Sequence, residues 1–486
     1  MKNKLAQFLM FVPLVIGIFL RIKFYLVNRP FWHDECSLAV NIINSGFGDY
    51  LVGPLPYFQS APPVFMVLSK LMYLIHPAAP ELMLRFIPLL AGILSVPVFF
   101  VLSKRILKNN ILIFIANLLF AINCQLIYYA QEFKQYSLDV LAVILCLLIF
   151  EKLRFNHLNL KKKIVFSSSI AFLSVISLPA MFVLGAYVVL EIFEIPRDRL
   201  LKSSLYLIPA AVVNLLYYLF ILAPSKVIMM QTFSDMWSKG FLSLNIFQDL
   251  SVFKMNFLYF FSPCKMVLFG MILFVSGVVV LIKRRERLDK MLLLTVLFSL
   301  LAAFAHIYPF KERVSLYLIP LFLLIILSAF CVKMQARKVY LSIMIFMALL
   351  FFGGYNLDYL KSFGRENLFE RENPSILMEY LKNNYKYGEY VVYNDASDSE
   401  FLFYGRHYGL ITPELKTAKI QLSSYGEEWY KSVLSNLPKG NIYWFYYPYD
   451  YVTKPVVSFL KDWARKNGEI LLEKEYGRSY LLHLKL

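Results

Sequence analysis

Long runs of hydrophobic residues, separated by short polar segments, fill the first three quarters of the chain. A run of roughly 18 residues or more is long enough for a helix to cross the hydrocarbon core of a bilayer. The first run, Leu5–Leu26, has no small-residue cleavage site and is too long for a signal peptide, which favours an uncleaved span. The pattern predicts about eleven membrane-spanning helices. They are expected at 6–27, 84–103, 111–129, 136–152, 164–178, 179–195, 203–222, 258–282, 291–308, 314–332 and 339–357.

Two longer polar segments interrupt the predicted spans. The first, 28–83, contains a short apolar stretch of its own, Val64–Ile75, which follows Pro62-Pro63. Because this stretch is short for a span, we expect a helix lying at the membrane surface. The second segment, 223–257, is predicted to be a loop. Both belong to a predicted membrane domain over residues 1–357.

After about Tyr355 the pattern changes to short bursts of β-forming residues that alternate with helical stretches. Such alternation is typical of a small α/β domain. The sequence therefore predicts a soluble α/β domain over residues 358–486. The bursts are Tyr390–Tyr393, Ile442–Tyr446 and Ser479–Leu484, and the helical stretches are Ser375–Asn383 and Val456–Asn467.

Composition agrees with a membrane protein. Hydrophobic residues make up 59% of the chain and charged residues 17%, whereas a soluble domain has about 25% charged residues. The formal net charge is +18, but from Asp358 onward 17 basic residues balance 17 acidic ones. The basic surplus therefore lies between the apolar runs and not on a soluble face, which excludes nucleic-acid binding as the main function.

The distribution of basic residues predicts which side each segment occupies. The segments 104–110, 151–163, 191–202, 283–290 and 333–338 together carry 19 Lys and Arg against 6 Asp and Glu. Basic loops stay in the cytoplasm, so these segments and the N-terminus are expected there. An odd number of spans then places the C-terminal domain outside. The predicted fold class is a polytopic α-helical protein of the cytoplasmic (inner) membrane with a small extracytoplasmic α/β domain.

Several charged residues from distant parts of the chain are expected to meet at the outer face. Asp34 and Glu35 follow the first span, and the other charged groups lie at the outer ends of later spans. Solvated turns and snorkelling basic side chains are alternative interpretations, but ionisable groups at this depth are costly and usually functional. The other charged groups are Arg85, Glu132, Lys134 and Arg313.

This set of residues suits transfer chemistry with a phosphate leaving group. A carboxylate can remove a proton from a hydroxyl or amine nucleophile. Cations stabilise a departing phosphate, and arginine binds it in a bidentate manner. Outside the cytoplasm, where nucleotide sugars are absent, the activated donor would be a polyprenyl-phosphate sugar.

Four short motifs, in this order, resemble those of the membrane glycosyltransferases of superfamily C. The nearest patterns are those of family 39, which includes dolichyl-phosphate-mannose–protein mannosyltransferases and bacterial aminoarabinose–lipid A transferases. The resemblance covers most of residues 1–335, and the C-terminal domain agrees only in its placement. The motifs are Trp32-His33-Asp34-Glu35, Pro62-Pro63 with Leu84–Pro88, Tyr129–Leu138, and Glu312-Arg313 with Pro320.

The resemblance implies roles for these residues. Asp34 becomes the candidate base that activates the acceptor, Glu35 its supporting neighbour, and Glu132 a second acid. Candidate groups for binding the donor phosphate are Arg85, Lys134 and Arg313. The chain departs from the family where Lys134-Gln135 replaces the usual Arg-Pro, and where Val314 replaces the tyrosine that usually follows the late arginine.

No cofactor is firmly implied. Some relatives bind a divalent cation near the acidic pair, so a divalent cation stays open, although three adjacent residues in one loop rarely converge on a metal without distant ligands. The five cysteines have neither disulfide-type nor zinc-type spacing.

The favoured function is a glycosyltransferase that moves a sugar from a polyprenyl-phosphate donor to a lipid, glycan or protein acceptor. A polysaccharide polymerase or flippase and a non-catalytic assembly protein are the alternatives. A flippase should carry charges along a path through the membrane, whereas these spans are mostly apolar.

Overall fold

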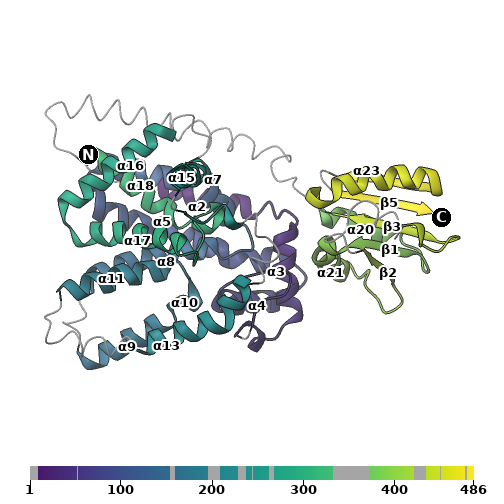
Figure 1. The fold of residues 1–486 in the computed structure, drawn as a ribbon, viewed down its shortest axis with the longest axis horizontal. Coiled ribbons are helices and arrows are strands. Elements are labelled where there is room, and N and C mark those ends of the chain that lie inside the picture. Colours follow the sequence, from purple (N-terminus) through teal and green to yellow (C-terminus); the bar gives the residue numbers. More distant parts are fainter. Residues whose placement is uncertain are drawn as a thin grey trace.

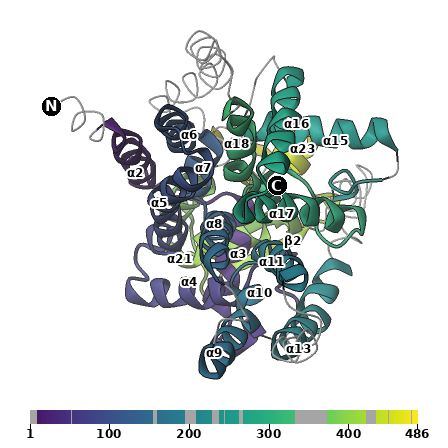
Figure 2. The same cartoon turned by 90° about the vertical axis from the view of Figure 1, so that its left-hand side faces the viewer.

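The computed structural model describes residues 9–51, 53–153, 159–194, 208–227, 237–243, 245–261, 267–331, 373–420, 434–448, 450–476 and 479–486. It consists of a helical bundle and a smaller sheet domain (Figure 1). The C-terminal domain lies at one end of the bundle, next to α3 (His33–Asn44) and α4 (Pro63–Ile75). Viewed along the long axis, the sheet domain lies behind the bundle (Figure 2).

Helices occur in each predicted span that falls within the described residues, and the last predicted span, 339–357, lies outside them. Two helical stretches, Pro80–Leu107 and Ile208–Val227, are long and apolar enough to cross a membrane by length and composition. The short apolar stretch in residues 28–83, the first outer segment of the predicted topology, forms a helix, α4, as predicted. The bundle helices are α2 (Val12–Tyr25), α5 (Pro80–Leu107), α6 (Asn110–Ile122), α7 (Cys124–Tyr129), α8 (Tyr136–Lys152), α9 (Leu160–Ala171), α10 (Leu173–Ile176), α11 (Ala180–Glu194), α13 (Ile208–Tyr217), α15 (Ile246–Phe261), α16 (Val267–Arg284), α17 (Arg287–Phe304) and α18 (Leu318–Ser328).

Two predicted spans are divided in the structure. The stretch 111–129 forms α6 and α7, which meet at Asn123, whose side chain accepts a hydrogen bond from the Leu126 amide and caps α7. The stretch 164–178 forms α9 and α10, which meet at Phe172.

The bundle core is built around two helices. α5 packs against α2, α4, α6 and α8, and α18 packs against α5, α6 and α16. Every residue of α18 is buried, as expected for a helix that is apolar on all sides. These contacts place the ends of α5, α7, α8 and α18 near one another, where the charged groups lie.

The C-terminal domain has helices on both faces of a five-stranded sheet. The strand order is β2-β1-β3-β5-β4. β1 pairs in parallel with β2 and β3, and β5 pairs antiparallel with β3 and β4. The predicted α/β architecture is thus confirmed within the described residues, whereas the predicted boundary at 357/358 lies outside them. The strands are β1 (Tyr390–Asn394), β2 (Lys416–Ile420), β3 (Ile442–Tyr447), β4 (Glu469–Tyr476) and β5 (Ser479–Lys485), and the helices are α20 (Pro374–Asn384), α21 (Asp398–His407) and α23 (Asp450–Asn467).

The two faces of this sheet belong to different hydrophobic cores. Val392 of β1 packs with Leu460 and Ala464 of α23. On the other face, Val391 belongs to a core that includes Phe31 of the first outer segment. The C-terminal domain and the segment that carries the acidic motif therefore share one core.

Candidate functional site

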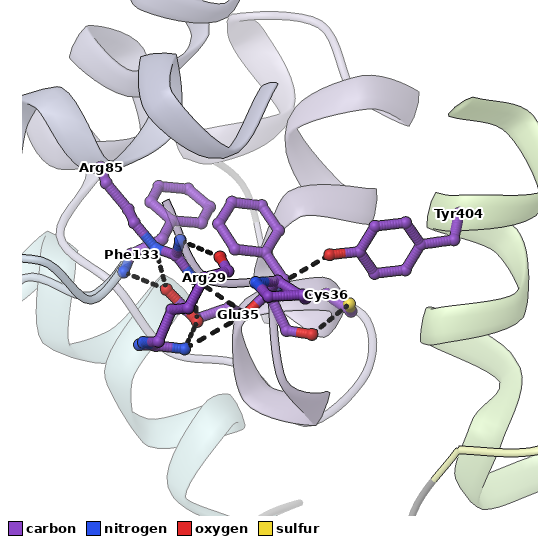
Figure 3. A network of polar contacts seen from close by, with 8 residues as sticks. Arg29, Glu35, Cys36, Arg85, Phe133 and Tyr404 are labelled. Carbon is purple, nitrogen blue, oxygen red and sulfur yellow. Dashed lines mark hydrogen bonds and ion pairs between the residues drawn. The ribbon is translucent and has the colours of Figure 1, made fainter. Parts of the chain in front are cut away.

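Glu35 lies at the centre of a buried charge cluster (Figure 3). Its side chain is 0% exposed and accepts four hydrogen bonds. Arg85 donates through Nε at 2.8 Å and Nη2 at 2.7 Å, and Arg29 donates through Nη1 at 2.7 Å. The Phe133 amide donates at 2.7 Å. This one carboxylate therefore joins the first outer segment, α5 and the turn before α8.

Arg85 is fully engaged in this cluster. Besides its two bonds to Glu35, it donates through Nη1 to the Arg29 carbonyl at 2.5 Å and through Nη2 to the Pro30 carbonyl at 3.3 Å. Its guanidinium also lies 4.5 Å from the centre of the Phe31 ring, a cation–π contact. All three nitrogens of Arg85 thus hold the chain at residues 29–35 in place.

Asp34 points to a different partner. Its Oδ2 lies 2.6 Å from Nη2 of Arg313, and 20% of its side chain and 24% of the Arg313 side chain are exposed. The Arg313 guanidinium also lies 5.5 Å from the centre of the Trp32 ring. Asp34 and Glu35 occupy the first turn of α3, where neighbouring side chains point about 100° apart. The helix therefore separates an accessible acid from a buried one.

The backbone around Arg313 is held by a buried amide side chain. Arg313 lies in the 3₁₀ helix Glu312–Ser315. The Glu312 amide donates to Oδ1 of Asn256 at 2.5 Å, and Asn256 Nδ2 donates to the Phe310 carbonyl at 2.8 Å. Asn256 of α15 is fully buried. The 3₁₀ helix that carries Arg313 is thus fixed to α15, which orients Arg313 towards α3.

The turn between α7 and α8 contributes Glu132 and Lys134. Both are buried, and Lys134 Nζ donates to Oε1 of Gln59 at 2.5 Å. Within the described part of the chain, neither carboxylate oxygen of Glu132 has a hydrogen-bond partner. A Cβ atom at Gly92 would lie 2.6 Å from the Cβ of Ala130, so the glycine lets this turn approach α5 closely.

The cations and acids shift one another's pKa values. Burial disfavours the charged form of Asp34, but the charges of Arg313, Lys134 and His33 outweigh it and lower the pKa. For Glu35, burial is likewise outweighed by Arg29 and Arg85, which lower its pKa. Asp34 and Glu35 are therefore both ionised at neutral pH.

Glu132 and Lys134 shift in the opposite directions. Burial and the charge of Glu35 raise the pKa of Glu132, and burial lowers the pKa of Lys134. Both shifts favour the neutral forms, as expected for groups removed from water. The turn before α8 is thus the part of the site where the surrounding protein stabilises a charged side chain least.

Four of the six residues predicted from the sequence form two adjacent pairs, and Glu132 and Lys134 lie in the turn before α8. Glu35 and Arg85 pair with each other, whereas Asp34 and Arg313 form the accessible pair. Sequence reasoning missed Arg29, the second partner of Glu35. A signal was available, because Arg29 directly follows the first span on the predicted outer side, where basic residues are less frequent.

The polar side chains of the acidic motif do not converge on one point in the structure. Its three polar side chains turn to different partners: His33 Nδ1 lies 3.0 Å from Glu400 Oε1, Asp34 contacts Arg313, and Glu35 is enclosed by arginines. Among the residues that the structure describes, no three His, Cys, Asp or Glu side chains converge as ligands would.

The fold is similar to that of two kinds of solved membrane-enzyme structure. ArnT from Cupriavidus metallidurans matches in the apo state with a TM-score of 0.53 at 10% identity, over 96% of this chain and 97% of that one. ArnT bound to undecaprenyl phosphate matches with a TM-score of 0.54 at 11% identity, over the same shares.

The second kind is the oligosaccharyltransferase AglB from Archaeoglobus fulgidus, solved with an inhibitory peptide and a dolichol-phosphate. It matches with a TM-score of 0.52 at 13% identity, over 99% of this chain and 74% of that one. Neither a protein-family model nor a curated protein matches the sequence. The structural likenesses confirm the fold that the resemblance to membrane glycosyltransferases of superfamily C implied.

Proposed function

We propose that the protein is a membrane glycosyltransferase that moves a sugar from a polyprenyl-phosphate-linked donor to an acceptor at the outer face of the cytoplasmic membrane. Two solved structures with this fold support the donor class, because one contains undecaprenyl phosphate and the other a dolichol-phosphate. The acceptor would be a lipid, a glycan or a protein. The multi-pass topology predicted from the basic loops places the motif and the C-terminal domain outside the cytoplasm.

The observation that carries the proposal is the accessible pair of Asp34 and Arg313. A carboxylate and a guanidinium lie 2.6 Å apart and are partly exposed, beside a fully buried charge cluster that fixes the same helix turn. Transfer from a phosphate-linked sugar needs both groups within a few ångströms: a base for the nucleophile and a cation for the leaving group.

The proposed reaction is a single displacement that inverts the anomeric centre. Asp34 accepts the proton of the acceptor hydroxyl or amine as that atom attacks the anomeric carbon. The bond between this carbon and the phosphate oxygen breaks, and its electron pair leaves with the polyprenyl phosphate. Arg313, with Lys134 close by, would stabilise the charge that grows on the phosphate.

Donor binding would also strengthen the base. In the free protein, Arg313 pairs with Asp34 and contributes to its lowered pKa, which makes Asp34 a weak base. A donor phosphate would compete for the same guanidinium. As Arg313 turns to the phosphate, the pKa of Asp34 rises and proton transfer from the acceptor becomes easier.

The remaining residues would support this pair. We assign Glu35, Arg85 and Arg29 to positioning the motif, because every nitrogen of Arg85 already donates to the protein. This revises the phosphate-binding role expected for Arg85. Glu132 is kept as a candidate second acid, because its raised pKa favours the protonated form.

The test is transfer of labelled sugar from polyprenyl-phosphate donors, carrying several hexoses or pentoses, in membranes that contain wild-type protein or Asp34→Asn. Asparagine keeps the size but cannot accept the proton, so transfer should fall by about 10²–10⁴-fold. Asp398→Asn is the matched control, because Asp398 also pairs with a cation, Lys419 at 2.7 Å, but lies in the C-terminal domain.

The outcomes separate the competing functions. Wild-type transfer that collapses in Asp34→Asn and persists in Asp398→Asn supports the transferase and its base. Equal transfer in all three proteins removes Asp34 from the mechanism. Absence of transfer with every donor would favour transport or assembly instead.

A further inference from the structure

The C-terminal domain contacts the segment that carries the proposed base. α21 packs directly on α3. The Phe31 amide donates to the Tyr404 hydroxyl at 2.7 Å, and Ser37 Oγ donates to Ser399 Oγ at 2.9 Å. Figure 3 shows Tyr404 reaching from the green helix, α21, towards the buried charge cluster. These contacts lie before and after Asp34 in the chain.

One of the contacts involves the residue next to Asp34. His33 Nδ1 lies 3.0 Å from Oε1 of Glu400, whose side chain is 0% exposed. The second oxygen of Glu400 accepts a hydrogen bond from Ser399 Oγ at 2.9 Å. Glu400 is therefore a buried carboxylate held by its own helix on one oxygen and by the acidic motif on the other.

The first turn of α3 depends on such external contacts. Trp32 occupies the N-cap position of α3 and makes no side-chain capping bond. Serine, threonine, asparagine or aspartate at that position would have bonded the free amides and fixed the turn. Here Glu35 fixes the turn from the bundle side and His33 from the side of the C-terminal domain. Asp34 lies between these two attachments.

We propose that Glu400 is a positioning residue for the transfer reaction, holding Asp34 in place through His33. The proposal rests on the proposed function, because it gives Asp34 its role as base. It also assigns the C-terminal domain a part in the chemical step. α21 stays in contact with α3 during turnover and keeps the carboxylate of Asp34 in its reactive position. A displacement of about 1 Å at a reacting group can cost about 10²-fold in rate.

The main test compares Glu400→Ala with Glu400→Gln. Alanine removes both contacts of the side chain, and kcat should fall at least about tenfold with little change in the KM for the donor. Glutamine keeps an acceptor oxygen for His33, so it should restore most of the rate. The double variant His33→Ala/Glu400→Ala should be no slower than the slower single variant, because both changes break the same contact.

Glu389→Ala is the matched control in the same domain. Glu389 is also buried, accepts a hydrogen bond from Trp444 Nε1 at 2.6 Å, and lies 3.4 Å from a histidine, His483. It directly precedes β1 and does not belong to α21. This variant should lose domain stability but keep the kcat of the folded protein. Equal losses of kcat in Glu389→Ala and Glu400→Ala would reduce Glu400 to a stability residue and overturn the proposal.

A disulfide between the domains tests whether α21 stays on α3 during turnover, without relying on loss of activity. Ser37→Cys/Ser399→Cys, made in a Cys36→Ala background, should form a bond on oxidation, because the two hydroxyl oxygens lie 2.9 Å apart. The cross-linked protein should transfer sugar at the rate of its reduced form. Transfer that is lost on oxidation and regained on reduction would mean that α21 must leave α3, which contradicts the proposal.

The failures are distinguishable. If wild-type protein transfers no sugar from any donor, the proposed function fails and the positioning role falls with it. If wild type is active, Asp34→Asn is inactive and Glu400→Ala matches wild type, the positioning role alone fails.

Discussion

Asp34 and Glu35 are neighbours in one helix turn, yet they occupy opposite environments. Glu35 is enclosed by two arginines and a backbone amide and is not exposed. Asp34 has a single arginine partner and is partly exposed. The helix turns one acid into the core and leaves the other accessible. A two-residue acidic motif can thus combine an architectural group with a reactive one.

The two ion pairs should differ in energy for the same reason. Removing one partner of a buried ion pair costs about 3–5 kcal/mol, because the other charge stays buried and uncompensated. The partly exposed pair of Asp34 and Arg313 should contribute less, because water reaches the charge that is left behind. Loss of Glu35 should therefore affect folding, whereas loss of Asp34 should affect the reaction.

The largest expected effect is on stability, in Glu35→Gln. Two buried guanidinium groups would lose their counter-charge, so the free energy of unfolding should fall by about 3–5 kcal/mol. Thermal unfolding in detergent, alongside the yield of folded protein, measures this loss. Asp34→Asn should unfold at nearly the wild-type temperature. If both variants are destabilised equally, the contrast between the two acids does not hold.

Much of the fold was predictable from the sequence, because hydrophobic runs and β-rich bursts are local patterns. The strands β1, β3 and β5 coincide with the three predicted bursts. β2 and β4 were missed, since they lie at the sheet edges and carry many exposed residues, with four of the five β2 residues outside the core. An edge strand lacks the strong apolar signal of a central one.

The gathering of the six predicted residues was foreseeable from the sequence, whereas Arg29 was missed and the pairing of the charges was not foreseeable. Motifs and topology brought Asp34, Glu132 and Arg313 to one face. That Arg85 pairs with Glu35, and Arg313 with Asp34, depends on the rotation of the first turn of α3 and on how α5 packs beside it. Contacts between residues so far apart in the chain leave no trace in local periodicity. The attachment of α21 to α3 was missed for the same reason.

Arg313→Met tests the contrast between the accessible and the buried ion pair by changing the arginine instead of the acid. Removing one preorganised donor to a developing negative charge typically costs about 10²–10³-fold in kcat. Arg313→Lys keeps the charge but not the planar fork, so its loss should be smaller. Arg85→Lys should instead lower stability, measured by thermal unfolding. A large loss of stability in Arg313→Met with unchanged kcat would assign this arginine to architecture.

The pH dependence of transfer tests the electrostatic difference. The lowered pKa of Asp34 means that the free protein keeps its base ionised well below neutral pH. The kcat/KM of wild type should therefore show no acid limb from Asp34 between about pH 5 and 8, because the ordinary aspartate pKa is already about 3.9. In Arg313→Met, less positive charge opposes the effect of burial, so the pKa of Asp34 rises. The acid limb of the kcat/KM profile should therefore move to higher pH. Both proteins should carry His33→Gln, since histidine titrates in this range. An unmoved profile would show that Asp34 does not accept the proton.

The smallest expected effect comes from Glu132. Burial and the charge of Glu35 raise the pKa of Glu132 in the folded protein, so its ionised form destabilises the fold as pH rises above the unfolded value of about 4.3. Glu132→Gln should therefore be more stable than wild type at pH 8, by about 1 kcal/mol, and the difference should shrink towards pH 5. Thermal unfolding at both pH values measures it. If the variant is instead less stable at pH 8, Arg29 or Lys134 pairs with Glu132, and the buried cluster extends to the turn before α8.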